Sequence, residues 1–298
     1  ALADQGARAL LAQAMTPGRK GWRLRLNLEA VPELAALPWE LAYGGPRLAY
    51  LSTNPATALA RCLPHEEAIG RPKTSWPLEV LLAWAEPLDR PPIDAEGEVE
   101  AVRQALRPLE EKGKLRLREC AHATPESLPE AFAGGADIFH FIGHGDLEGE
   151  RGVLYLEESG PSRQSVPLSG EELANLLRGV VQPDRQAART AGLVVLNACR
   201  SGAAQPGSAT LSGLAPGLLR QTLIPAVIGM QYPVASEVAA RFAGYFYRAL
   251  ISRGGGQVDY AISMARKALY AEFGAARRDW SAPVLYMQVE DVRIFDLV

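Results

Sequence analysis

The pattern of apolar residues divides most of the chain into short continuous runs and longer periodic segments. The continuous runs indicate strands buried on both faces, and the periodic segments indicate amphipathic helices. The predicted strands span 78–85, 115–120, 136–142, 192–198, 222–230 and 285–290. The predicted helices span 95–112, 125–133, 169–178, 208–220, 234–252 and 257–273. This alternation predicts an α/β fold in three layers, with a mostly parallel central sheet.

Two regions depart from the alternation. A polar stretch at 146–165 contains VLYLEE at 153–158, which predicts a hairpin. Near the start of the chain, WRLRLNL at 22–28 alternates like a half-buried strand, and 47–51 is its expected antiparallel neighbour. LPWELAY at 37–43 predicts a short helical turn between them.

The chain shows neither a repeat nor a low-complexity linker, so we predict a single domain over 1–298. In this domain, residues 1–75 elaborate an α/β core formed by 76–298. The chain starts at Ala1 rather than at a methionine, and 1–15 predicts a helix with nothing before it to pack on. We therefore expect a fragment of a longer, multidomain protein.

The composition narrows the classes of function. The 298 residues are 48% hydrophobic and 22% charged, with a formal net charge of −3, which is typical of a soluble chain with a large core. Basic residues are scattered among acids, so we expect no nucleic-acid contact. No apolar run approaches about 20 residues, and no secretion signal opens the chain, so we expect no membrane span and a cytoplasmic location. The three cysteines predict neither a disulfide framework nor a metal site.

The segment FHFIGHG at 139–145 places His140 and His144 four residues apart. On a helix, this spacing would let both imidazoles bind one metal ion. The residues between them are aromatic, branched and glycine, which favour a strand. Four residues of strand separate the two rings by about 13 Å, too far to share an ion. The two histidines must therefore have different roles.

A second segment, GLVVLNACRSG at 192–202, places Cys199 just after another buried strand. Reactive groups in a parallel sheet collect at the carboxyl ends of the strands, so Cys199 and His144 are expected at the same edge. The imidazole can take the thiol proton or stabilise the thiolate, and then protonate the leaving group. Gly145 and the Ser-Gly pair at 201–202 allow backbone N–H groups to approach a substrate carbonyl as an oxyanion hole.

Each of these residues also has a purely structural interpretation. A lone cysteine after an apolar strand is usually a small core residue, and a histidine at a loop is usually a surface or capping residue. The coincidence of both at strand ends, in turns that contain glycine, favours catalysis for Cys199 and His144. His140 is expected to be a core histidine with a hydrogen-bonded ring. The remaining cysteines and histidines have no assigned role: Cys62, Cys120, His65 and His122.

These residues carry a resemblance to a known family. His-Gly at 144–145, followed by Ala-Cys-Arg-Ser-Gly at 198–202, is similar to the caspase arrangement of histidine and nucleophile. The chain more closely resembles the CHAT-domain family of caspase- and separase-like proteases. FHFIGHG resembles its H-x-x-x-H-G block, LNACRSG its N-A-C-x-S-G block, and LPWELAY its P-W-E-L signature. The three blocks appear in the family's order.

The resemblance implies a caspase-like sandwich and a cysteine endopeptidase with Cys199 and His144 as its dyad. The backbone amides of Gly145 and Cys199 would hold the oxyanion, and neither a metal nor an organic cofactor is implied for catalysis. The implied partner is a protein or peptide substrate, with a sensor domain fused or associated. Family members act in regulated bacterial proteolysis, including antiviral defence and cell death.

The residues around the expected dyad bear on substrate choice. Metacaspases, which are similar to this fold, carry an aspartate two residues before the cysteine, where this chain has Asn197. An asparagine supplies no charge to hold Arg or Lys, which argues against a strict basic preference. Arg200 is a further candidate for substrate binding. Asp137 and Asp146 are acidic candidates, for which surface or turn positions are the alternative.

Three other functions compete with proteolysis. A catalytically silent CHAT-like module would use the same fold to bind partners. A doubly wound nucleotide-binding domain would need a glycine-rich turn after its first strand, but EPLDRPP at 86–92 has no glycine. A hydrolase of other esters or amides also fits, because a thiol dyad does not select its acyl group.

Overall fold

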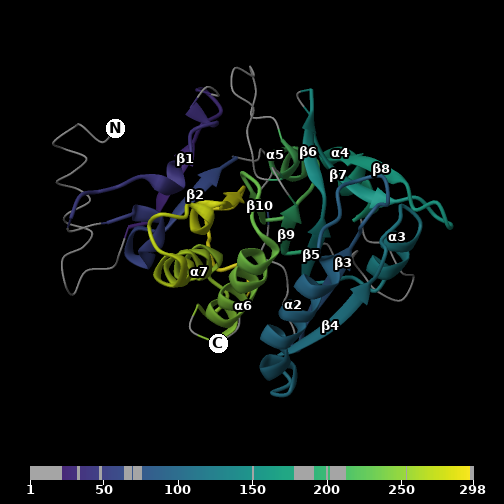
Figure 1. Ribbon diagram of the computed structural model, residues 1–298. Helices are drawn as coiled ribbons and strands as arrows, with labels where there is room; N and C mark the ends of the chain where they lie inside the picture. The colour runs from purple at the N-terminus through teal and green to yellow at the C-terminus, as the bar shows by residue number, and fades with distance from the viewer. Residues whose placement is uncertain are drawn as a thin grey trace.

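A computed structural model describes residues 22–31, 34–46, 49–63, 69, 76–149, 151–177, 191–198, 201, 213–252 and 254–295. Its centre is an eight-stranded sheet in the order β1-β2-β11-β10-β9-β5-β3-β4 (Figure 1). The strands are β1 (Leu24–Asn27), β2 (Leu59–Cys62), β3 (Leu78–Trp84), β4 (Leu115–Cys120), β5 (Ile138–Gly143), β9 (Leu193–Ala198), β10 (Ala226–Met230) and β11 (Pro283–Met287). All eight pair within one sheet.

Five neighbouring strands, β4, β3, β5, β9 and β10, run parallel to one another. β11 is antiparallel to β10. β2 pairs parallel with β11, and β1 pairs parallel with β2. The central strands are buried along nearly their whole length, which explains their continuous apolar sequences. The predicted mostly parallel sheet is confirmed.

Helices cover both faces of this sheet. One layer contains α2 (Ala95–Glu110), α6 (Ser236–Ser252) and α7 (Val258–Phe273), which lie side by side in Figure 1. The other contains α3 (Ser127–Phe132), α4 (Gly170–Leu176) and α5 (Leu214–Arg220). Side chains alternate along β3, so that Val80 and Leu82 join the core under the first layer and Leu81 and Ala83 join the second. The three-layer architecture is confirmed.

A small second sheet begins directly after β5. It contains β6 (Gly145–Glu148), β7 (Arg151–Glu157) and β8 (Ser165–Ser169), paired antiparallel in that order. β7 is buried over most of its length and confirms the hairpin expected at 153–158. This sheet therefore emerges from the carboxyl edge of the central strands.

The N-terminal region differs from the prediction. β1 pairs parallel with β2, rather than antiparallel with 47–51, and β2 was not among the predicted strands. Leu51 instead belongs to a 3₁₀-helix, η3 (Leu51–Thr53), and 47–48 lie outside the described residues. β2 is short and its third residue is the buried Arg61, so it lacks the apolar pattern of a core strand. The helix expected at 1–15 also lies outside the described residues.

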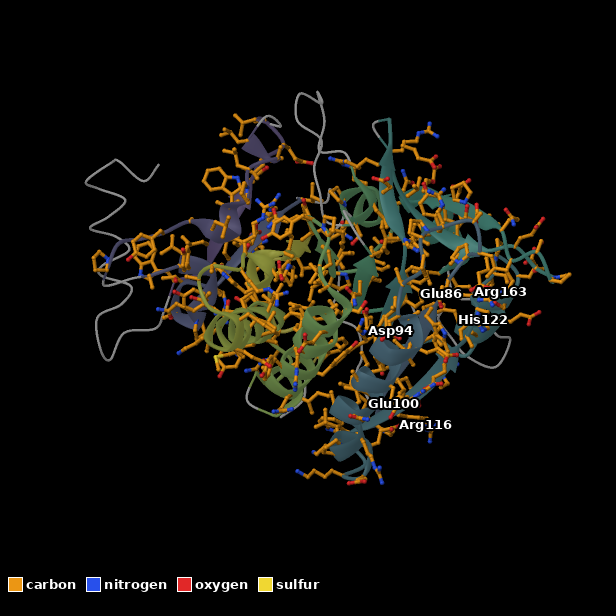
Figure 2. The ribbon with its side chains drawn as sticks, in the orientation of Figure 1. Glu86, Asp94, Glu100, Arg116, His122 and Arg163 are labelled. Carbon is orange, nitrogen blue, oxygen red and sulfur yellow. The ribbon has the colours of Figure 1, made fainter. Side chains whose placement is uncertain are left out.

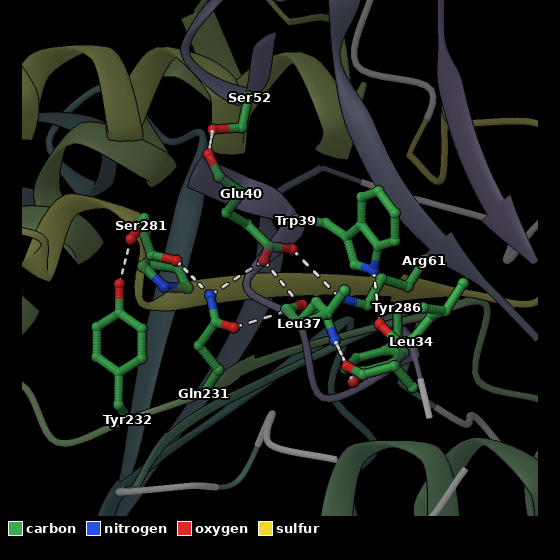
Figure 3. A network of polar contacts seen from close by, with 12 residues as sticks. Leu34, Leu37, Trp39, Glu40, Ser52, Arg61, Gln231, Tyr232, Ser281 and Tyr286 are labelled. Atoms are coloured by element: carbon green, nitrogen blue, oxygen red, sulfur yellow. Dashed lines mark hydrogen bonds and ion pairs between the residues drawn. The ribbon is translucent and has the colours of Figure 1, made fainter. Parts of the chain in front are cut away.

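A buried ion pair joins this region to the sheet (Figure 3). Glu40, in the 3₁₀-helix η2 (Trp39–Leu41), accepts hydrogen bonds from Arg61 at 2.8 and 3.3 Å and from Gln231 at 3.0 Å. Glu40 is 0% and Arg61 2% exposed. Burial opposes ionisation, but the charges of Arg61 and Arg266 outweigh it and lower the pKa of Glu40. The glutamate of the P-W-E-L segment is thus a structural residue.

Candidate active site

His144 follows β5 at the carboxyl end of the parallel strands. β5 lies between β3 and β9, and its last residue, Gly143, pairs with Ala198 at the end of β9. A Cβ atom on Gly143 would approach the Phe141 ring to 2.8 Å and the Ala85 carbonyl oxygen to 3.0 Å. The glycine before His144 therefore lets the chain leave the sheet in close contact with its neighbours.

His140 has the structural role that the sequence predicts. Its ring is 1% exposed, and Nδ1 lies 3.1 Å from the Tyr247 hydroxyl on α6. Burial lowers the pKa of His140 from 6.5 to about 3, so the imidazole is neutral at physiological pH. It lies within the sheet and is separate from the edge where His144 is found.

His140 should make the fold sensitive to acid. Its folded pKa is below the unfolded value, so the unfolded chain takes up more protons below pH 6.5 and stability falls as pH falls toward about 3. Between pH 6.5 and pH 5, the uptake of this proton by the unfolded chain lowers the free energy of unfolding by about 2 kcal/mol. Urea unfolding of wild type and His140→Gln at pH 7 and pH 5 measures it. Wild type should lose about 2 kcal/mol more than the variant; equal losses would contradict the assignment.

The His144 ring is half-buried and in contact with the loop that follows β3. Partial burial lowers the pKa of His144, and the Arg90 charge lowers it further, while a hydrogen bond to the Pro91 backbone and the charges of Glu86 and Asp89 raise it. Pro91 has no N–H, so its carbonyl is the acceptor. Nε2 is buried and has no hydrogen-bond partner among the residues that the structure describes. His144 is therefore a neutral imidazole oriented by a main-chain carbonyl.

The loop after β3, which orients His144, contacts β8 and β7 through Asp89 and Arg90. Asp89 accepts hydrogen bonds from the backbone N–H and the hydroxyl of Ser165, both at 2.7 Å. The Arg90 guanidinium lies 3.6 Å from the centre of the Tyr155 ring. The Tyr155 N–H in turn donates to the His144 carbonyl at 3.1 Å. The second sheet thus positions both His144 and the carbonyl that holds it.

A buried carboxylate anchors the first residues of the same loop. Glu157 is 1% exposed and accepts the Glu86 N–H at 2.8 Å and the Arg163 Nε–H at 2.6 Å. His122 Nδ1 lies 3.0 Å from the same carboxylate, and Figure 2 shows Glu86, His122 and Arg163 close together. Burial would raise the pKa of Glu157, but these hydrogen bonds outweigh it and lower the pKa. Glu157 therefore remains an anion that holds the loop.

The backbone N–H of Gly145 is not used by the pairing of β6 with β7. Gly145 pairs with Leu154, and the hydrogen bond on this side of the pair runs from the Tyr155 N–H to the His144 carbonyl. This is the pattern of a non-hydrogen-bonded antiparallel pair, in which the N–H of Gly145 points away from β7. The amide beside the imidazole is thus not used by the ladder.

Asn197 lies in the same edge, in β9 beside Ile142 of β5. Cys199 and Arg200 lie outside the described residues. Ser201, which is 1% exposed, is fixed by its hydroxyl, which donates to the Leu196 carbonyl and accepts the Met230 N–H, both at 2.9 Å. The chain is therefore anchored on both sides of residues 199–200.

The two acidic candidates occupy different places. Asp137 precedes β5, whereas His144 follows it, so the strand separates them by about 20 Å. Asp137 is 4% exposed and its carboxylate accepts the Glu79 N–H at 2.9 Å, which corrects both its surface interpretation and its candidacy for substrate binding. Asp146 is half-buried in β6, two residues after His144, and its Oδ1 accepts the Leu147 N–H at 2.8 Å.

Sequence reasoning missed the residues that orient His144. Pro91 acts through its carbonyl, which side-chain motifs do not reveal. Glu86, Asp89 and Arg90 belong to the loop after β3, at the same edge as His144. The rule that ligands collect at the carboxyl ends of parallel strands could have identified this loop.

Similar structures identify the class of this fold. Gingipain R (RGPB), an Arg-specific cysteine proteinase, matches with a TM-score of 0.56 and 12% identity over 98% of this chain and 68% of its own. The complex of Porphyromonas gingivalis RgpB pro- and mature domains matches with a TM-score of 0.53 and 13% sequence identity, over 95% of this chain and 69% of its own. The Saccharomyces cerevisiae separase–securin complex matches with a TM-score of 0.49 and 14% sequence identity, and the match covers 85% of this chain but only 15% of the other. The protein has a caspase-like α/β fold.

The family follows from the sequence as a whole. The model of the CHAT domain matches residues 1–288, and the chain belongs to the CHAT-domain family. A search among curated proteins found no match.

Within the described ranges, no three His, Cys, Asp or Glu side chains form a group that could hold a metal ion. None of the helices described is long and apolar enough to cross a membrane.

Proposed function

We propose that this protein is a cysteine endopeptidase in which Cys199 is the nucleophile and His144 the general acid and base. The pairing of Gly143 with Ala198 supports this proposal most directly, because His144 and Cys199 are the next residues of two adjacent parallel strands. Adjacent strands are about 4.8 Å apart, so a short turn at each end suffices to bring the imidazole and the thiol together.

The proposed reaction follows from the state of His144. Its lowered pKa leaves the imidazole unprotonated at neutral pH, ready to accept the thiol proton. The thiolate attacks the scissile carbonyl, and the N–H groups of Gly145 and Cys199 stabilise the oxyanion. The imidazolium then protonates the leaving amine, and water hydrolyses the thioester with His144 as base. The Pro91 carbonyl does the orienting work that a third carboxylate would do.

The proposed substrate is a protein, cleaved in regulated bacterial proteolysis that serves antiviral defence or cell death. A fused or associated sensor domain, which the family resemblance implies, is part of the proposal. Asn197 at the strand edge supplies no negative charge for a basic P1 residue. Arg200 and Asp146 remain proposed contributors to substrate binding.

A peptide-library digestion tests this function. We expect wild type to cut a defined subset of peptides, with a preference other than Arg or Lys before the cut, and Cys199→Ala to cut none. Cleavage by both proteins would point to a contaminating protease or to another nucleophile. An intact library with wild type, in the presence of its sensor partner, would favour the catalytically silent module.

The orientation of His144 gives a prediction of its own. Asp89→Ala removes both hydrogen bonds with Ser165 and loosens the loop that contains Pro91. We expect kcat to fall about tenfold with little change in KM, because a misplaced base slows the chemical step more than it weakens substrate binding. Steady-state cleavage of the best library peptide measures this. Glu126→Ala is the matched control, since Ser159 donates to Glu126 at 2.6 Å in a similar exposed pair. Equal rates for both variants would contradict the positioning role.

A further inference from the structure

A groove of about 500 Å³ lies between α2 and α6. The two helices run parallel, because Glu98 lies near Ser236 at their beginnings and Gly244 packs against Ala105 further along. Small residues line much of the groove: Gly97, Ala101, Ala105, Ala240 and Gly244. They leave a space open that larger side chains would fill.

Glu98 is the unusual residue of this groove. It lines the groove although it is only 7% exposed. Ser236 lies near its carboxyl group and acts to lower its pKa, but Oε1 is buried and has no partner in the part of the chain that the structure describes. Burial, with the Asp94 charge, raises the pKa of Glu98 to about 8. Buried polar atoms are normally hydrogen-bonded, so this oxygen lacks a partner, and once Glu98 is ionised that partner must be a donor.

The charges around Glu98 indicate the kind of donor. Asp94, at the start of α2, and Glu237, at the start of α6, line the same end of the groove. Arg241 also lines the groove, but its guanidinium is 3.4 Å from Glu272 on α7. Arg248 lies further along α6. The end that contains Glu98 is therefore acidic and suited to a cation.

We propose that this groove binds the side-chain ammonium of a lysine from a protein partner, with Glu98 as its acceptor. An ammonium is a compact charge with three donors and can use a single free oxygen, whereas a guanidinium prefers a bidentate carboxylate. The aliphatic stem of lysine fits along the small residues of the walls. This site is independent of the proposed proteolysis.

Binding at this site should release a proton. The Glu98 carboxyl group is largely protonated at pH 7 and must ionise to pair with the ammonium, so its proton passes to solvent as the complex forms. The lysine itself stays protonated up to about pH 10. Affinity should therefore rise about tenfold between pH 7 and pH 9.

Calorimetric titration of the full chain tests this proposal without any measurement of activity. The probe is the capped pentapeptide acetyl-Ala-Ala-Lys-Ala-Ala-amide, compared with versions that carry norleucine or arginine at the centre. Glu98→Gln keeps the shape of the side chain and removes its charge. Glu100→Gln is the matched control, because Glu100 is an exposed glutamate on the same helix, bonded to Arg103 and outside the groove (Figure 2).

We expect the lysine peptide to bind wild type and Glu100→Gln equally, and Glu98→Gln at least tenfold more weakly, with the norleucine peptide not binding. The affinity for wild type should rise with pH as stated, and that of Glu98→Gln should not. Thermal melting confirms that both variants are folded. Equal binding to Glu98→Gln, equal binding of the arginine peptide, or no binding by wild type at pH 9 would each overturn the proposal.

Discussion

Cys199→Ala is expected to lower kcat/KM for peptide cleavage by about 10⁴-fold or more, to the level of the uncatalysed background. The expected loss is large because, in the proposed mechanism, the Cys199 sulfur is the atom that bonds to the substrate. His144→Ala should cause a loss of similar size, since an unassisted thiol is mostly protonated at neutral pH. The double variant should be no slower than either single variant, because the two residues act as one unit.

Cys120→Ala provides the matched control for this experiment. Cys120 is 7% exposed on the edge strand β4, and burial raises the pKa of its thiol. Its removal should leave the rate of cleavage within about twofold of wild type, measured well below the melting temperature. A Cys199→Ala protein that retained activity would rule out the proposed nucleophile.

Glu40→Gln is expected to destabilise the fold by about 3–5 kcal/mol, the usual cost of breaking a buried ion pair. The substitution keeps the shape of the side chain but leaves the buried guanidiniums of Arg61 and Arg266 without a neutralising charge. The pKa of Arg266 is already lowered to about 10, chiefly by burial. Equilibrium unfolding in urea at pH 7 measures the loss.

The control is an ion pair of the same kind on the surface. Arg103 and Glu119 are 2.6 Å apart with side chains 40% and 33% exposed, and Glu119→Gln should cost less than about 1 kcal/mol. A similar loss for the two variants would show that the buried pair has no special role. Partial recovery of stability by replacing Glu40 and Arg61 together with apolar residues would agree with it, because one of the two buried guanidiniums is then removed while Arg266 remains.

The parts of the fold that the sequence predicted are those in which apolar residues alone determine the structure. β4 begins and ends at the predicted residues, and β3, β9 and α2 differ from their predicted ranges by at most a few terminal residues. In these elements the buried face is continuous, so the periodicity is unambiguous. β2 was missed because Arg61 interrupts its apolar run, and the burial of that arginine depends on Glu40, a residue remote in sequence.

The site was predictable only in part, for a related reason. The sequence located His144 at a strand end and identified His140 as a core residue, since both depend on the local strand pattern. It could not show that the Pro91 carbonyl orients the imidazole, because a backbone acceptor leaves no mark in the residue type. It also did not indicate that Glu157 and Glu98 are buried, because the segments that cover them are brought together only by the tertiary structure.

Alkylation of the native protein tests the central claim most directly. Iodoacetamide at pH 7 should label Cys199 within minutes, while Cys62 and Cys120, both buried in the fold, should stay unmodified. His144→Ala should slow the labelling of Cys199 at least tenfold, and His140→Gln should not, as judged by mass spectrometry of tryptic peptides. Labelling of Cys199 at the same rate in wild type and His144→Ala would mean that the imidazole does not act on the thiol, and would contradict the proposed dyad.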